Sequence, residues 1–183
     1  MFGRKMTRAT VLAAALGLTL GLSAGPAAAA DTIKIAVPSP FTGSAAGYGE
    51  NVKAGVVMKL EEINAAGGVG GKKIEAVYLD EQCEPREAAT VSSSIVNDPD
   101  IVGIVGHLCS SAHLAALPTY VREGIAAITP TATSTSISSK SKDEKGLTWS
   151  FRNVYRDDFQ GKFLADYTDK VLGLKKVAVF YEN

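Results

Sequence analysis

The sequence has few of the residues on which most enzymes and metalloproteins depend. Its 183 residues include two histidines, two cysteines and one tryptophan. Two cysteines are too few for a disulfide-dense small protein, and an apolar content of 46% is too high for a disordered chain. The 19 basic and 19 acidic residues balance. Without a positive excess to neutralise phosphates, we expect no nucleic-acid partner.

Motifs of common catalytic and nucleotide-binding sites are also missing. Ser110 does not lie in a G-x-S-x-G elbow, and neither G-x-G-x-x-G nor G-x-x-x-x-G-K-[ST] occurs. His107, Cys109 and His113 form an H-x-C-x-x-x-H pattern, which is a weak metal signature and loses a ligand if Cys109 is oxidised. We therefore expect no cofactor and no metal, and we do not expect an enzyme.

The first 30 residues have the layout of a secretory signal peptide. A short basic segment precedes an apolar stretch over residues 9–24, and small residues continue to Ala30. We predict a signal peptide over residues 1–30, cleavage after Ala30 and a periplasmic mature protein. An uncleaved membrane anchor is the alternative, which the small and polar residues within the stretch disfavour. Three basic and no acidic residues lie in this segment, so residues 31–183 carry a net charge of −3.

The two cysteines agree with export. An even number of cysteines in an exported chain favours a disulfide, here between Cys83 and Cys109. Two free thiols are the alternative.

The mature chain alternates strand and helix patterns. Short runs rich in β-branched residues predict strands, and apolar residues at helical spacing predict helices between them. This order predicts an α/β fold with an open parallel sheet and helices on both faces. The expected strands are 33–37, 74–79, 101–106, 125–129, 148–154 and 176–180; the expected helices are 52–63, 85–97, 110–123 and 159–171, with a loop or interrupted helix over 131–145.

The last predicted strand ends the chain, and no helix follows to cover it. This suggests a fragment of a longer protein, with a short natural product as the alternative.

Polar loops follow three of the predicted strands, at 38–48, 106–111 and 129–134. Ligands of open α/β sheets bind beyond the carboxyl ends of the strands. The hydroxyl and backbone N–H groups of these loops suit a carboxylate, particularly at a helix N-terminus. A structural interpretation remains open for each loop, because Ser110 or Ser111 could simply cap a helix.

Five segments together resemble a known family. They are I-K-I-A-V-P-S-P-F-T-G from residue 33, E-E-I-N-A-A-G-G-V-G-G-K-K-I from residue 61, D-E-Q-C-E-P-R-E-A from residue 80, G-H-L-C-S-S from residue 106 and I-T-P-T-A-T from residue 128. The sequence resembles the N-terminal portion of branched-chain amino acid (Leu/Ile/Val-type) substrate-binding proteins of ABC transporters, which are type I periplasmic binding proteins.

The resemblance implies a two-lobed protein that closes on its ligand. Residues 31–183 would form the first α/β lobe, incomplete and without the second lobe. The function implied is capture of a branched-chain or related amino acid and delivery to the membrane subunits of an ABC importer, by a monomer. A sensor or regulatory domain of the same fold that binds an amide, urea or aromatic acid is the alternative. The family also carries a disulfide at the positions of Cys83 and Cys109.

The resemblance also implies a set of ligand-binding residues. Ser110 would bind the ligand carboxylate, and Thr133 both the carboxylate and the ammonium group. The carbonyl of Thr131, where alanine is common in the family, would accept from the ammonium group. Tyr48 and Leu108 would line the side-chain pocket.

Asp157 lies in a segment that also resembles the family, and we count it among the candidate ligand-binding residues.

Overall fold

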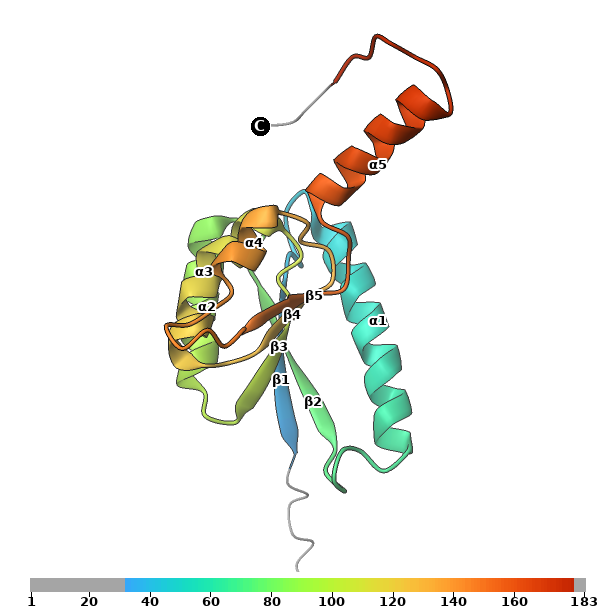
Figure 1. The fold of residues 1–183 in the computed structure, drawn as a ribbon. Coiled ribbons are helices and arrows are strands. Elements are labelled where there is room, and N and C mark those ends of the chain that lie inside the picture. Colours follow the sequence, from blue (N-terminus) through green and yellow to red (C-terminus); the bar gives the residue numbers. More distant parts are fainter. Residues whose placement is uncertain (1–31, 180–183) are drawn as a thin grey trace, which may run out of the picture.

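The structure, a computed structural model, describes residues 32–179 and contains one open parallel sheet (Figure 1). Five strands lie in the order β2-β1-β3-β4-β5, and each neighbouring pair is parallel. The predicted α/β class and parallel sheet are confirmed. The strands are β1 (Ile33–Ser39), β2 (Ile74–Asp80), β3 (Ile101–Val105), β4 (Ala127–Thr129) and β5 (Ser150–Arg152).

Helices lie on both faces of the sheet, as predicted. In Figure 1, α1 runs along one face, α2 and α3 lie on the other, and α5 extends away from the sheet. The interrupted helix expected over 131–145 is present as the short α4. The helices are α1 (Ala46–Ala65), α2 (Pro85–Asn97), α3 (Ser110–Glu123), α4 (Thr135–Lys140) and α5 (Asp157–Lys170).

The main hydrophobic core lies between the sheet and helices α2 and α3. Ile95 of α2 and Tyr120 of α3 are fully buried, and they belong to one cluster with Ile104 and Ala127 of the central strands. Burial of apolar surface of this kind is the dominant favourable contribution to folding. The core holds α3 against the sheet and so places the first residues of α3 at the edge where the strands end.

The opposite face of the sheet is only partly covered. Strand side chains alternate between faces, so Ile128 and Phe151 lie opposite to the core residue Ala127. Each keeps 48% of its surface exposed. Helix α1 packs mainly on β1 and β2, so the apolar surface over β4 and β5 stays open.

A tight turn of glycines joins α1 to β2. Gly68 has a φ of +76°, and a Cβ there would lie 1.9 Å from the carbonyl oxygen of Lys72. Asn64, near the end of α1, accepts a hydrogen bond from the backbone N–H of Ile74 at 2.7 Å and donates to its carbonyl at 2.8 Å. These bonds fix where β2 begins.

The strand predicted over 176–180 is wrong for its described residues. Residues 176–179 have no secondary structure, and Val177 and Val179 are 66% and 80% exposed. A strand needs a hydrogen-bonded neighbour, and α5 carries this segment away from the sheet (Figure 1). No residue of α5 is buried. The last residue of the predicted strand, Phe180, lies outside the described residues.

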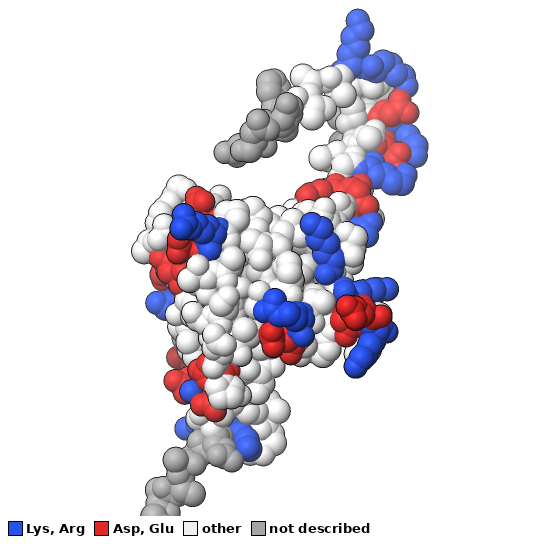
Figure 2. Space-filling view, turned by 90° about the vertical axis from the view of Figure 1, so that its left-hand side faces the viewer, with Lys and Arg blue, Asp and Glu red and all other residues white. Residues whose placement is uncertain are grey.

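The predicted signal peptide, residues 1–30, also lies outside the described residues. Within residues 32–179, no helix combines the length and apolar character needed to cross a bilayer. Figure 2 shows the face over α2, α3 and α4, where basic and acidic side chains lie next to one another in small groups. That face carries no extended patch of one charge.

Asp143 organises the turn between α4 and β5. Its carboxylate accepts hydrogen bonds from the backbone N–H groups of Lys145 and Leu147 at 2.9 and 2.8 Å, and from the indole N–H of Trp149 at 3.0 Å. The bond from Trp149 is the main reason why the pKa of Asp143 lies below its usual range. The Asp143 carboxylate therefore makes its whole contribution to stability at pH values above the ordinary Asp pKa. This contribution is lost as the pH falls through the lower pKa of the folded state.

We expect Asp143→Ala to shift the fluorescence of Trp149, the single tryptophan of this chain, toward the emission of a solvated indole. The reason is that the substitution removes the acceptor that holds the indole N–H. Steady-state emission spectra at neutral pH measure the effect, and Glu144→Ala, which removes the neighbouring exposed carboxylate, is the control. Identical spectra for the two variants would contradict this role of Asp143.

Candidate ligand-binding site

Three loops meet at the carboxyl-terminal edge of the sheet. They follow β1, β3 and β4, which are neighbours in the strand order. From β1 the chain passes to β2 on one side, whereas β3, β4 and β5 are added on the other side, so the connections diverge between β1 and β3. In open α/β sheets this divergence creates the crevice in which ligands bind. The three loops singled out from the sequence are thus brought to one place.

The loop after β3 approaches β1 too closely for any side chain at its first residue. Gly106 has a φ of +154°, and a Cβ there would lie 2.4 Å from the carbonyl oxygen of Pro38. The chain then turns through His107 and Leu108 into α3, whose first residue is Ser110. This close approach places the N-terminus of α3 beside the end of β1.

Ser110 does not cap α3, contrary to one interpretation of the sequence. The N-cap is Cys109, which has an extended backbone, and no side chain caps the helix. Because the disulfide holds Cys109 in place, the helix begins one residue earlier than capping by Ser110 would require. The Ser110 hydroxyl oxygen instead accepts a hydrogen bond from the backbone N–H of Ser134 at 3.2 Å. Its hydroxyl hydrogen remains available to donate, beside the N–H groups that lack acceptors within the first helical turn.

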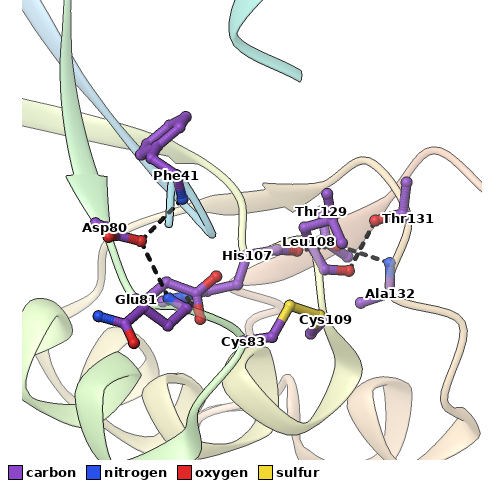
Figure 3. Close-up of a disulfide and its surroundings, with 11 residues drawn as sticks. Phe41, Asp80, Glu81, Cys83, His107, Leu108, Cys109, Thr129, Thr131 and Ala132 are labelled. Carbon is purple, nitrogen blue, oxygen red and sulfur yellow. Dashed lines mark hydrogen bonds and ion pairs between the residues drawn. A yellow bond between two sulfur atoms is a disulfide. The ribbon is translucent and has the colours of Figure 1, made fainter. Parts of the chain in front are cut away.

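The loop after β4 is hydrogen-bonded to the loop after β3 (Figure 3). The hydroxyl of buried Thr129 donates to the carbonyl of His107 at 2.6 Å and accepts from the N–H of Ala132 at 3.0 Å. The hydroxyl of Thr131 donates to the carbonyl of Leu108 at 2.7 Å. Thr129 thus orients both loops, a role that sequence reasoning missed although its position at a strand end was a signal.

Arg152 supports the same loop from β5. Its guanidinium donates to the carbonyls of Ala132 and Ser134 at 3.2 and 3.0 Å, and to the hydroxyl of Ser138 at 3.0 Å. Sequence reasoning assigned this arginine no role in the site. Its positive charge behind the loop favours an anionic group in front of it.

Ser110, Thr131 and Thr133 come together in this arrangement, as the sequence predicts. The backbone N–H of Asp157, at the start of α5, donates to the carbonyl of Thr133 at 3.2 Å and brings a fourth predicted residue to the loop. The cluster offers hydroxyl and N–H groups at the N-terminus of α3. Such groups suit a ligand that carries a carboxylate. Their contact with a ligand stays a prediction.

The two residues predicted to line a side-chain pocket lie apart. Leu108 is half-buried and belongs to the loop that bonds to Thr131. Tyr48 lies in the first turn of α1 and is 68% exposed, and in the part of the chain that the structure describes its side chain makes no hydrogen bond to these loops. A pocket that uses both residues needs a wall from elsewhere.

Asp80, at the end of β2, anchors the loop after β1. Its carboxylate accepts from the backbone N–H of Phe41 at 2.8 Å (Figure 3). It also accepts from the hydroxyl of Thr42 at 2.5 Å and from the N–H of Gln82 at 3.2 Å. Burial opposes ionisation of this carboxyl, but the hydrogen bonds outweigh it and hold the pKa of Asp80 below its usual range. Sequence reasoning missed this residue as well.

The predicted disulfide between Cys83 and Cys109 is confirmed (Figure 3). Its Cα atoms are 5.4 Å apart. It joins the loop after β2 to the N-cap of α3, across the end of the intervening strand β1. The disulfide therefore stabilises the loop after β3 and the first residues of α3, which include Ser110.

The members of the H-x-C-x-x-x-H pattern have other partners. The sulfur of Cys109 is in the disulfide, and the buried rings of His107 and His113 contact the hydroxyls of Tyr120 and Ser150 at 2.9 and 2.8 Å. Among residues 32–179, no group of three or more histidine, cysteine, aspartate or glutamate side chains is placed to hold a metal ion.

Comparison with known proteins agrees with this geometry. The chain is 40% identical over 180 residues to the amino acid binding protein of Pseudomonas aeruginosa, covering 98% of this chain and 46% of that protein. It is 42% identical over 151 residues to the leucine-, isoleucine-, valine-, threonine- and alanine-binding protein of the same organism, covering 80% and 39%. It is 33% identical over 156 residues to the Leu/Ile/Val-binding protein of Escherichia coli, covering 85% and 41%. The chain thus spans less than half the length of these relatives.

A solved structure supports the same assignment. The branched-chain amino acid transporter substrate-binding protein LivJ of Streptococcus pneumoniae, in complex with isoleucine, superposes with a TM-score of 0.69 at 35% identity, covering 78% of this chain and 39% of that one. The family model described as periplasmic binding protein matches residues 32–183. A match over most of the sequence, with relatives more than 30% identical, shows that the chain belongs to the periplasmic binding protein family.

Proposed function

We propose that this chain is the N-terminal part of an extracytoplasmic solute-binding protein. It captures a branched-chain or related amino acid and delivers it to the membrane subunits of an ABC importer. The names of its relatives support this ligand class. The protein acts by binding and not by catalysis, since the site offers hydroxyl and N–H groups without a paired nucleophile and base.

The observation that carries the proposal is the position of Ser110. It is the first residue of α3, it lies at the divergence of the sheet connections, and its hydroxyl is oriented by the N–H of Ser134. A zwitterion taken out of water must have both charges met by hydrogen bonds. Donors at a helix N-terminus meet the carboxylate, and the helix dipole adds to the attraction.

The other residues take complementary roles in this proposal. Thr133 binds the carboxylate and the ammonium group, and the carbonyl of Thr131 accepts from the ammonium group. Tyr48 and Leu108 contact the ligand side chain from one side. Asp157, bonded through its N–H to Thr133, closes the polar end of the site.

The proposal includes an arrangement of the whole protein. Residues 1–30 are a signal peptide, the mature protein is periplasmic and monomeric, and residues 31–183 form its first lobe, which is incomplete. The open apolar face at Ile128 and Phe151 supports this arrangement, because exposed surface of that kind normally has a partner. The exposed position of Tyr48 agrees, since a second lobe would supply the missing wall.

We expect Ser110→Ala in the complete natural protein to weaken L-leucine binding about tenfold to a hundredfold. A hydrogen bond to a charged group contributes about 1.5–3 kcal/mol, and the alanine side chain cannot donate one. Isothermal titration calorimetry measures the dissociation constant. Ser111→Ala is the matched control, because Ser111 is the next residue of α3 and is exposed.

Equal affinities of the two variants would exclude Ser110 from the site. L-isoleucine and L-valine should bind to the wild type as well. Absence of binding for all three amino acids, with a response to benzoate or urea, would favour the sensor alternative.

A further inference from the structure

A buried polar cluster lies directly behind the loop that carries Ser110. Glu81, His107, His113 and Tyr120 are all fully buried, and Figure 3 shows Glu81 beside His107 near the disulfide. Both carboxylate oxygens of Glu81 and the Nδ1 atom of His107 lack a hydrogen-bond partner within residues 32–179. Nδ1 lies 3.8 Å from Oε2 of Glu81. A buried carboxylate without a nearby positive group is costly, so this contact needs a functional or structural reason.

The hydrogen bonds of His113 define where its proton lies. Its Nδ1 accepts from the backbone N–H of His107 at 3.2 Å, and its Nε2 lies 2.8 Å from the hydroxyl of Ser150. Burial is the main cause that lowers the pKa of His113 to about 4; the neighbouring His107 ring and Arg152 act in the same direction, and a backbone hydrogen bond with Gly106 opposes them in part. The ring is therefore neutral at neutral pH, with its proton on Nε2.

Glu81 and Tyr120 face the two ring nitrogens of His107. Burial, and then the charge of Glu81, raise the pKa of Tyr120, so its hydroxyl keeps its proton. That hydroxyl lies 2.9 Å from Nε2 of His107 and is able to donate to it when the ring proton is on Nδ1. In that tautomer the Nδ1 proton faces the Glu81 carboxylate. The opposite tautomer would set a bare ring nitrogen against a buried carboxylate.

This proton arrangement is coupled to the loop. The carbonyl of His107 accepts from Thr129, its N–H donates to His113, and its ring is hydrogen-bonded to Tyr120. Nδ1 of the same ring faces Glu81 at 3.8 Å. Ser110 follows three residues later. The disulfide connects the residues two positions beyond Glu81 and His107, so the Glu81–His107 contact and the covalent bond join the same two loops.

We propose that Glu81 and His107 are positioning residues, whose Nδ1–H to carboxylate contact holds residues 107–111 so that Ser110 presents its hydroxyl and N–H to the ligand. This inference rests on the proposed function, because it assigns Ser110 a ligand contact. Neither residue touches the ligand; both act through the backbone of the loop.

Nitrogen NMR of the imidazole rings tests the proton arrangement directly. In the complete natural protein, a His113→Gln variant identifies the signals of His113 by their loss, and a His107→Gln variant identifies those of His107 in the same way. We expect a protonated Nδ1 for His107 and a protonated Nε2 for His113, which are opposite tautomers. An unprotonated Nδ1 on His107 would overturn the proposal.

Ligand titration tests the coupling to Ser110. Glu81→Gln keeps the shape of the side chain and removes its charge, and we expect it to weaken L-leucine binding about tenfold. Glu84→Gln, which removes an exposed carboxylate three residues away, should bind as the wild type does. Thermal melts verify that both variants fold, and a purely structural role of Glu81 would change the melt without changing the affinity.

The outcomes separate this inference from the proposed function. If the wild type binds L-leucine and the two glutamine variants bind it equally, the positioning role is wrong while the binding function stands. If the wild type binds none of L-leucine, L-isoleucine and L-valine, the proposed function fails and this inference fails with it.

Discussion

Exchange of both Cys83 and Cys109 for serine is expected to lower the free energy of unfolding by about 3.5 kcal/mol. The disulfide spans a sequence separation of 26 residues, and in the chain-entropy model a cross-link of that span removes this amount of freedom from the unfolded chain. Gln82 and Cys83 have φ values of 54° and 59°, in the left-handed region that non-glycine residues rarely adopt. Relaxation of this turn in the variant would offset part of the loss.

Urea unfolding of the oxidised wild type and of the double variant measures the difference. The wild type treated with a phosphine reductant is the control, and it should unfold at the urea concentration of the variant. The same substitution should weaken ligand binding, because Cys109 is the N-cap residue that places Ser110. Equal free energies of unfolding for the oxidised wild type and the variant would show that the disulfide does not stabilise the folded protein.

Acidification from pH 6.5 to pH 4 is expected to cost about 3 kcal/mol of stability through His113 alone. The ring is buried and neutral, and burial is the main cause that lowers its pKa from 6.5 to about 4. The unfolded chain binds a proton at this residue before the folded protein does. The contribution is therefore fully present above pH 6.5 and is lost as the pH falls through the folded-state pKa.

His113→Gln isolates this contribution. We expect the variant to be less stable than the wild type at neutral pH, because it lacks the buried ring that contacts both the His107 N–H and the Ser150 hydroxyl. Between pH 6.5 and pH 4 the free energy of unfolding of the variant should fall by about 3 kcal/mol less than that of the wild type. The carboxyl groups titrate in both proteins, so their effect cancels in this comparison. Urea unfolding at several pH values measures both curves, and parallel curves would contradict a neutral buried His113.

Local patterns in the sequence predicted most of the fold correctly because they depend on neighbours along the chain. The run I-V-G-I-V predicted β3, and Pro85 predicted the start of α2. The same reasoning failed at residues 176–179, where a β-branched pattern is present and no strand lies alongside to pair with it. A pattern of apolar residues shows which side of a segment is able to be buried. The segment becomes a strand only when another strand lies beside it and pairs with it.

The candidate site was predictable in its loops and less so in its supports. Polar residues at strand ends indicated the loops 106–111 and 129–134, because parallel strands bring their ends to one edge. The family resemblance pointed to Ser110, Thr131 and Thr133 within these loops. Asp80 and Arg152 were missed, since each acts on backbone groups far away in the sequence. The spacing of residues along the chain does not predict contacts between groups that are so far apart in the sequence.

By itself, the sequence determined the α/β class, the alternation of strands and helices, the disulfide pair and the polar loops at the strand ends. The class, the elements and the loops follow from hydrophobic periodicity and local chemistry, which operate over a few residues. The disulfide pair follows from the presence of two cysteines in a chain predicted to be exported. Only the tertiary structure decided that Cys109 occupies the N-cap position of α3, that Thr129 joins two loops, and that Glu81 faces His107 in the interior. The physical reason is that hydrogen bonds and charge contacts depend on distances in space, which the sheet order sets between residues distant along the chain.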